Sequence, residues 1–287
     1  MTNNSILIVM AGYKEKNFAS SVKAIKDATA SDNVVYVFDQ HPIDHKKEFE
    51  DIPGCEYEHK IWDDILGPAA ARWRLVYDNI KYFSHVCIVS PDITLSTGWD
   101  TELLNMLEDE DVIFSGAGKV FVAQKDLFSI EATYADSNVF NKSQMIDRNF
   151  IFGKAEAFDK ILVPDFLKYH GENEYLSVSF LSKGYDIMSV PSSMYADSHS
   201  RQIENTYHTF SLEHKYNLVV DILHGKNLVK YKLSRQGVKR FLELHNISAD
   251  KINRLPYYAD DVSYDPYNLE MHGVDARRFI AGTKAVY

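Results

Sequence analysis

Apolar runs and amphipathic stretches alternate along the first half of the chain. Residues 6–10 form a continuous apolar run, which predicts a strand buried on both faces. Residues 18–30 follow with apolar side chains along one side, the spacing of an amphipathic helix. The same alternation continues, and it predicts strands at 34–38, 86–89 and 112–115 and helices from Pro68 onward and over 99–107. Strands that alternate with helices of about 10 to 15 residues indicate parallel βαβ units.

The second half of the chain is less regular. Its pattern predicts strands at 149–152 and 187–190 and helices at 172–181, 209–224 and 234–245. No segment has the composition of a linker between domains. We therefore expect one α/β domain that carries additional helices toward its carboxyl terminus.

Composition places the chain among ordinary soluble proteins. Of its 287 residues, 25% are charged and 45% are hydrophobic, and no apolar run approaches the roughly 18 residues that a membrane span needs. The amino terminus lacks the charged-then-apolar pattern of a secretory signal. Cys55 and Cys87 are too few for a disulfide scaffold or a zinc site. We expect a cytoplasmic protein with no membrane partner.

The net charge of −10 argues against a general nucleic-acid coat protein, because non-specific affinity comes from neutralised phosphates. A local basic segment does exist: residues 226–240 contain six basic residues and no acid. A solvated helix face is the favoured interpretation of this segment, and a phosphate-binding surface is the alternative.

Polar residues follow the strand predicted at 86–89. Ser90, Pro91 and Asp92 come directly after it, and in open α/β sheets ligands bind in the crevice beyond the carboxyl ends of strands. Hard divalent cations take oxygen ligands such as the Asp92 carboxylate, shared with substrate phosphates. The alternative is that Asp92 caps a turn after Pro91.

Two other segments could contribute to a nucleotide site. Gly12 would allow close backbone approach, and Tyr13 beside it could stack on a base. Arg72 falls one turn into its helix among small residues, where its guanidinium could grip a diphosphate or form a salt bridge with Asp63 or Asp64. No glycine-rich phosphate loop is present, which makes a kinase, a GTPase or a nicotinamide enzyme a poor interpretation.

Later segments add carboxylates and an imidazole. Glu172 and Glu174 begin a predicted helix, either as acids that its dipole favours or with one of them facing a sugar or an acceptor. His199 would be a metal ligand if it met Asp92 across a cleft, although a lone histidine is usually structural. The nucleophile elbow and zinc-protease motifs are absent, so a hydrolase has little support.

Taken in chain order, these segments resemble the N-acetylglucosaminyltransferase-like family that includes cytoplasmic enzymes glycosylating hydroxyproline. The matching segments are 11–15, the strand end at Gln40, 67–72, 90–92 with 98–100, 171–173 and 184–187. The resemblance implies the GT-A fold, a Rossmann-like and mostly parallel central sheet flanked by helices. It implies a nucleotide-sugar-binding catalytic domain over 1–205, with 206–287 as a helical extension packed on the same domain.

The resemblance also implies a donor, a metal and roles for single residues. The donor would be a nucleotide sugar, usually UDP-linked, with Mn²⁺ or Mg²⁺ and retention of the anomeric configuration. Glu172 and Asp92 would be the catalytic residues, and Asp92 and His199 would hold the metal. Tyr13 would contact the base and Arg72 the ribose or phosphates. The wider set that would bind the nucleotide is Ala11, Tyr13, Gln40, Gly67, Arg72 and Ser90; the residues facing the acceptor would be Trp99, Asn173 and Arg201.

Two departures from the family pattern bear on these roles. The first carboxylate of the metal motif falls on Ser90, and Lys14 and Glu15 replace the usual arginine and aspartate. Metal dependence would therefore be weaker than the family implies.

Several functions stay open at this point. The acceptor of the transferase could be a protein hydroxyl, a glycan, or a hydroxymethylated base of bacteriophage DNA that receives a glucosyl or arabinosyl group. The basic segment 226–240 favours a polyanionic acceptor. A sugar nucleotidyltransferase, which would carry a glycine-rich loop after the first strand, and a non-catalytic sugar-binding module, which Ser90 allows, are the rival classes.

Overall fold

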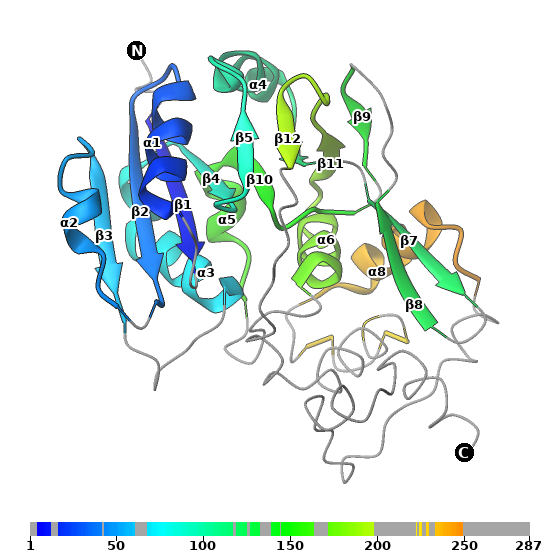
Figure 1. Cartoon of the computed structure of the whole chain (residues 1–287). Coiled ribbons are helices and arrows are strands. Elements are labelled where there is room, and N and C mark those ends of the chain that lie inside the picture. Colours follow the sequence, from blue (N-terminus) through cyan, green and yellow to red (C-terminus); the bar gives the residue numbers. More distant parts are fainter. Residues whose placement is uncertain are drawn as a thin grey trace, which may run out of the picture.

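The computed structural model of the chain describes residues 5–12, 17–41, 43–60, 68–116, 119–124, 127–132, 139–143, 145–163, 172–197, 222, 224–225, 228–229 and 233–248. Most of these residues belong to one eight-stranded sheet with helices on both faces (Figure 1). The strand order is β3-β2-β1-β4-β10-β6-β11-β9. The strands are β1 (Ile6–Gly12), β2 (Asn33–Asp39), β3 (Cys55–His59), β4 (His85–Val89), β6 (Val112–Ser115), β9 (Asn141–Lys142), β10 (Phe150–Lys154) and β11 (Asp186–Ser189).

The sheet is mixed and mostly parallel. β1 pairs in parallel with β2 and β4, β2 with β3, and β6 with β11. β10 runs antiparallel to both of its neighbours, β4 and β6, and β9 runs antiparallel to β11. The expectation of parallel strands therefore holds for β1, β2 and β4, and β3, which the pattern did not predict, is parallel as well. β10 is the exception. A strand buried on both faces has the same apolar pattern in either direction, so the pattern did not reveal this reversal.

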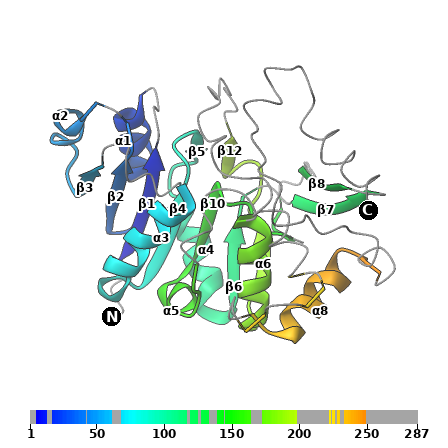
Figure 2. The same cartoon turned by 90° about the horizontal axis from the view of Figure 1, so that it is seen from below.

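Helices cover the two faces of the sheet, and the sheet separates two apolar cores. The helices are α1 (Phe18–Ala28), α2 (Lys46–Phe49), α3 (Pro68–Asn79), α4 (Trp99–Asp109), α5 (Ala155–Asp159), α6 (Glu172–Ser182) and α8 (Arg235–Leu244). Figure 2 shows α1 on one side of the sheet and α3, α5 and α6 on the other. Alternate residues of β1 divide between the cores: Ile8 packs with α1 and α4, and Val9 packs with α3 and α6.

Short elements complete the fold and were not predicted from the hydrophobic pattern. β5 (Ile93–Leu95) pairs with β12 (Tyr195–Asp197), and β7 (Lys119–Gln124) pairs with β8 (Leu127–Ala132), each as a separate antiparallel ribbon. Strands of three residues are too short to show a period, which is why β5 and β12 escaped prediction. The elements that were predicted differ from the observed ones by a few residues at their ends.

The helix predicted at 234–245 is α8, and it packs against α6. The Ser234 hydroxyl caps α8 by accepting a hydrogen bond from the Gly237 backbone N–H. Gly237 lies so close to Ser182 of α6 that an added Cβ would be 2.7 Å from the Ser182 Cα. Most of the helix predicted at 209–224 lies outside the described residues, and the boundary at 205 stays a prediction. Among the helices that the structure describes, none is both long and apolar enough to cross a membrane.

Candidate functional site

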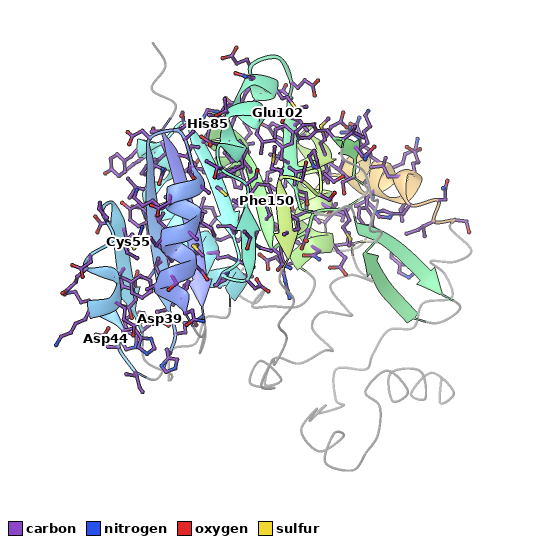
Figure 3. The ribbon with its side chains drawn as sticks, turned by 45° about the horizontal axis from the view of Figure 1, so that its top comes forward. Asp39, Asp44, Cys55, His85, Glu102 and Phe150 are labelled. Atoms are coloured by element: carbon purple, nitrogen blue, oxygen red, sulfur yellow. The ribbon has the colours of Figure 1, made fainter. Side chains whose placement is uncertain are left out.

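The candidate site lies at the edge of the sheet where β1, β2 and β4 end and β10 begins. The neighbours of β1 are β2, which follows it in the chain, and β4, which the chain reaches later, so the strand order reverses between β1 and β4. Ligands of open α/β sheets bind in the crevice at such a reversal. In Figure 3, Asp39 at the end of β2 marks this edge of the sheet, and His85 at the start of β4 marks the opposite edge.

A buried ion pair joins α3 to α6 at this edge. Arg72 Nη2 donates a 2.7 Å hydrogen bond to Glu172 Oε2, across 100 positions of the sequence. The two side chains are 3% and 0% exposed. Among the described residues, Arg72 Nε and Glu172 Oε1 have no hydrogen-bonding partner. Arg72 therefore forms its described salt bridge with Glu172, and Asp63 and Asp64, the partners expected from the sequence, lie outside the described residues.

The segment just before β10 connects this pair to the rest of the site. The carbonyl of Arg148 accepts a 3.1 Å hydrogen bond from Arg72 Nη1. The backbone N–H of Arg148 donates at 3.2 Å to Asn173 Oδ1 of α6. The Asn149 side chain accepts at 3.2 Å from the Ser90 hydroxyl after β4. Residues 147–149 thus hold three elements together, and sequence reasoning missed them because their partners are distant along the chain.

Asp147 extends the same network to β6 and β12. Its backbone N–H donates to the Ser115 hydroxyl at 2.6 Å, and its Oδ2 accepts from the Tyr195 hydroxyl at 3.2 Å. Gly116 is required here, because a Cβ at this position would lie 2.9 Å from the Tyr195 ring and 3.1 Å from Asp147 Oδ2. Ser115 at the end of β6 is therefore buried and hydrogen-bonded to this network.

Ser90 and Asp92 lie where the sequence predicted them, beyond the end of β4. The Ser90 hydroxyl is within 3.4 Å of Arg72 Nη1 in addition to its bond to Asn149. Asp92 is half-buried in the turn that enters β5. In the β5–β12 ribbon, Asp197 pairs with Ile93. The ribbon therefore holds Asp197 beside the residue that follows Asp92.

The end of β2 carries a second polar network. Asp39 is 1% exposed, and its Oδ1 accepts from the backbone N–H of His41 at 2.9 Å. Its Oδ2 accepts from the Tyr57 hydroxyl at 2.9 Å and lies 3.3 Å from His45 Nδ1. Burial raises the pKa of Tyr57, so the phenol stays protonated and able to donate. These contacts of the Asp39 carboxylate stabilise the loop that follows β2.

Gln40 and the start of α6 are also buried. Gln40 is 1% exposed, and its backbone N–H donates to the Gly12 carbonyl at 3.0 Å. Asn173 and Glu174 are 8% and 2% exposed, and neither Glu174 oxygen has a hydrogen-bonding partner among the described residues. Glu172 shows the stronger connection to the site because it contacts Arg72.

Two expectations need correction. Trp99 does not face an acceptor: it is 1% exposed in the core, with its ring against Phe150 and Phe152 and its indole N–H donating to the Thr29 hydroxyl. Gly12 makes room for the ring of Phe18 rather than for a ligand, because a Cβ at Gly12 would lie 2.5 Å from that ring.

Ala11 and Asp100, the residue after Trp99, are also buried in the fold. Ala11 is 8% exposed and packs in the core beside α3. Asp100 is fully buried, and its carboxylate accepts the backbone N–H groups of Ala30 and Ser31 at 2.8 Å each. Trp99 and Asp100 at the start of α4 therefore connect α4 to the residues that follow α1.

Tyr13, Gly67, His199 and Arg201 lie outside the described residues, and their expected roles stay predictions. Within the part of the chain that is described, no three histidine, cysteine, aspartate or glutamate side chains are grouped as a metal site. The described end of the basic segment is engaged in ion pairs, Lys239 with Glu243 and Arg240 with Asp186. Lys226, Lys230 and Lys232 lie outside the described residues, so the choice between a solvated helix face and a phosphate-binding surface stays a prediction.

Comparison with known proteins identifies a similar fold. No protein-family model matches the chain, and no curated protein matches it. Among solved structures, the chain resembles the mannosyltransferase PcManGT from Pyrobaculum calidifontis in complex with GDP-Man and Mn²⁺. The TM-score is 0.55 at 13% sequence identity, over 98% of this chain and 84% of that chain. The chain therefore has the α/β fold of GT-A glycosyltransferases, with a mixed, mostly parallel sheet flanked by helices.

Proposed function

We propose that the protein is a glycosyltransferase that transfers a sugar from a nucleotide-sugar donor to an acceptor hydroxyl. One observation carries the proposal: the buried Arg72–Glu172 pair and Asp92 gather at the edge of the sheet where the strand order reverses. That edge is the ligand-binding edge of open α/β sheets. The fold is shared with a structure that was solved with GDP-Man and Mn²⁺.

A divalent cation suits the donor atoms that this edge offers. Asp92 is half-buried in the turn after β4, and Asp197, two positions before His199 in the sequence, pairs with Ile93 beside it. Carboxylate oxygen suits both Mn²⁺ and Mg²⁺, and imidazole nitrogen suits Mn²⁺. Asp92 and His199 would hold the cation, which when bound would supply positive charge to the diphosphate leaving group.

The chemistry requires the acceptor and the sugar to meet in a site that excludes water. The acceptor oxygen bonds to the anomeric carbon, and the bond from that carbon to the diphosphate oxygen breaks with its electron pair leaving on the nucleoside diphosphate. The hydroxyl proton is released. Glu172 would accept a hydrogen bond from a hydroxyl of the sugar or the acceptor, since its Oε1 has no partner among the described residues. Burial of this carboxylate limits competition from water.

The nucleotide would lie along the ends of β1, β2 and β4. Ala11, Gln40 and Ser90 stand at those ends. In the sequence, Tyr13 falls between β1 and α1, and Gly67 falls between β3 and α3. Asn173 and Arg201 would face the acceptor. The family resemblance favours a UDP-linked donor and retention of configuration, whereas the solved structure binds GDP-Man, so both nucleotides belong in the test.

The test measures donor binding and turnover separately. Calorimetry with UDP, GDP and ADP, each with and without Mn²⁺, reports binding, and release of nucleoside diphosphate from UDP- and GDP-sugars reports turnover. We expect one nucleotide to bind in the presence of Mn²⁺, and we expect Asp92→Asn to abolish turnover. Asp51→Asn, at an exposed acid in the loop before β3, is the matched control.

The outcomes separate the rival functions. Binding of a nucleotide sugar without any turnover, toward water or toward a panel of sugar, peptide and hydroxymethylated DNA acceptors, would indicate a binding module. Failure of all three nucleotides to bind would refute the proposal. Proton NMR of the product gives the anomeric configuration.

A further inference from the structure

The partners of Arg72 point to a role that differs from phosphate binding. The guanidinium is buried, with Nη2 on Glu172 Oε2 and Nη1 on the Arg148 carbonyl and near the Ser90 hydroxyl. These contacts use both terminal nitrogens, and Nε is left without a partner among the described residues. To turn both terminal nitrogens toward a diphosphate, Arg72 would have to leave the buried Glu172 carboxylate unpaired, which is strongly unfavourable.

Glu172 shows the complementary pattern. Arg72 holds its Oε2 at 2.7 Å, and its Oε1 has no partner among the described residues. Glu172 is also the first residue of α6, where the positive end of the helix dipole stabilises a charged carboxylate. A carboxylate oxygen has two lone pairs, so a buried oxygen without a donor is ready to accept a hydrogen bond from a ligand.

We propose that Arg72 is a positioning residue: it fixes the Glu172 carboxylate with Oε2 toward itself, leaves the buried Oε1 to accept a hydrogen bond from a substrate hydroxyl, and does not bind the diphosphate. The proposal deepens the proposed function and depends on it. Arg72 reaches this role from α3 because the Arg148 carbonyl and Ser90 orient its guanidinium. A planar guanidinium held at several points restricts the rotation of the carboxylate that it contacts.

The experiment compares Arg72→Lys, Arg72→Gln, Glu172→Gln and the double variant Arg72→Gln/Glu172→Gln. Arg74→Gln is the matched control, because Arg74 lies two residues further along α3 and its side chain is 39% exposed. For each protein we measure the Kd of the nucleoside diphosphate with Mn²⁺, and kcat and KM for the donor sugar. Circular dichroism and thermal unfolding confirm that each variant is folded.

We expect Arg72→Gln to lower kcat by about a hundredfold while the Kd of the nucleoside diphosphate changes by less than about threefold. Arg72→Lys keeps the charge and should restore part of kcat. The double variant should be no slower than Glu172→Gln alone, because Arg72 acts through Glu172. Arg74→Gln should match the wild type.

Other outcomes overturn the proposal. A Kd weakened about tenfold or more in Arg72→Gln with kcat unchanged would make Arg72 a phosphate ligand. Additive losses in the double variant would show that the two side chains act independently. If Arg72→Gln does not fold, Arg72→Lys decides by the same split between Kd and kcat. Failure of the proposed function would look different, since the wild type itself would then bind no nucleotide and release none.

Discussion

Asp197 of β12 pairs with Ile93 of β5 in antiparallel register. Ile93 directly follows Asp92, and the two paired residues are more than a hundred positions apart in the sequence. The short ribbon therefore holds Asp197 beside the strand that begins just after Asp92, beyond the carboxyl end of β4. The place of His199, two positions further along the sequence, stays a prediction.

The first prediction concerns metal binding at this point. Asp92→Asn and His199→Gln should each weaken Mn²⁺ binding at least about tenfold, because each removes a donor atom of the proposed site. Electron paramagnetic resonance measures free Mn²⁺ in a titration with the nucleoside diphosphate present. Asp51→Asn should bind Mn²⁺ as the wild type does, and unchanged binding in both site variants would place the metal elsewhere.

The second prediction concerns the buried Asp100. Asp100→Asn should lower the free energy of unfolding by about 2 kcal/mol, because an amide cannot accept both N–H groups of Ala30 and Ser31. Glu102→Gln is the control in the same turn of α4, and its exposed side chain should leave stability within about 0.5 kcal/mol of the wild type. Urea unfolding followed by circular dichroism measures both, and equal stability of the two variants would contradict a fastening role for Asp100.

The third prediction concerns the contact between α8 and α6. Gly237→Ala should destabilise the protein by about 1 to 3 kcal/mol, because the new Cβ would lie 1.9 Å from the Ser182 hydroxyl and 2.7 Å from its Cα. Helix propensity alone would favour alanine by about 1 kcal/mol, so the sign of the change reports the contact. Gln236→Ala, exposed in the same turn, should not destabilise α8. Thermal unfolding measures both, and a stabilising Gly237→Ala would show that the helices are not packed this closely.

The fourth prediction is a pH dependence from His85. Burial lowers the pKa of His85 from 6.5 to about 4, and Lys154 contributes to the shift. Below pH 6.5 the unfolded chain therefore binds a proton that the folded protein does not, and stability falls progressively as the pH falls toward about 4. His85→Phe keeps a ring against Phe152 and removes this proton.

The measurement compares unfolding of the two proteins across this pH range. The wild type should lose about 1 kcal/mol more than His85→Phe, a figure reduced because the imidazole retains some solvent. Parallel curves for the two proteins would mean that the pKa of His85 is the same in the folded and the unfolded state. The carboxylates that both proteins share cancel in the difference.

The hydrophobic pattern was sufficient to predict the main secondary structure. The strands β1, β2, β4, β6, β10 and β11 and the helices α1, α3, α4, α6 and α8 lie close to the predicted ranges, whereas β3 was not predicted. Residues at the strand ends, Gln40, Ser90 and Asp92, were also found by their positions after apolar runs. The geometry of a helix or strand, together with burial of its apolar side chains, produces a local pattern of apolar residues in the sequence.

The local sequence pattern located these elements to within a few residues and showed which polar residues follow the strands. The three-dimensional structure was needed to show that β10 runs antiparallel, that Arg72 pairs with Glu172, and that Trp99 and Asp100 belong to the core. The partners in these contacts are brought together by the order of the strands, from positions as far as 100 residues apart. Such a contact between distant residues produces no periodic pattern in the sequence. Each of the two residues, seen alone, looks like an ordinary charge on a helix surface or an ordinary apolar side chain.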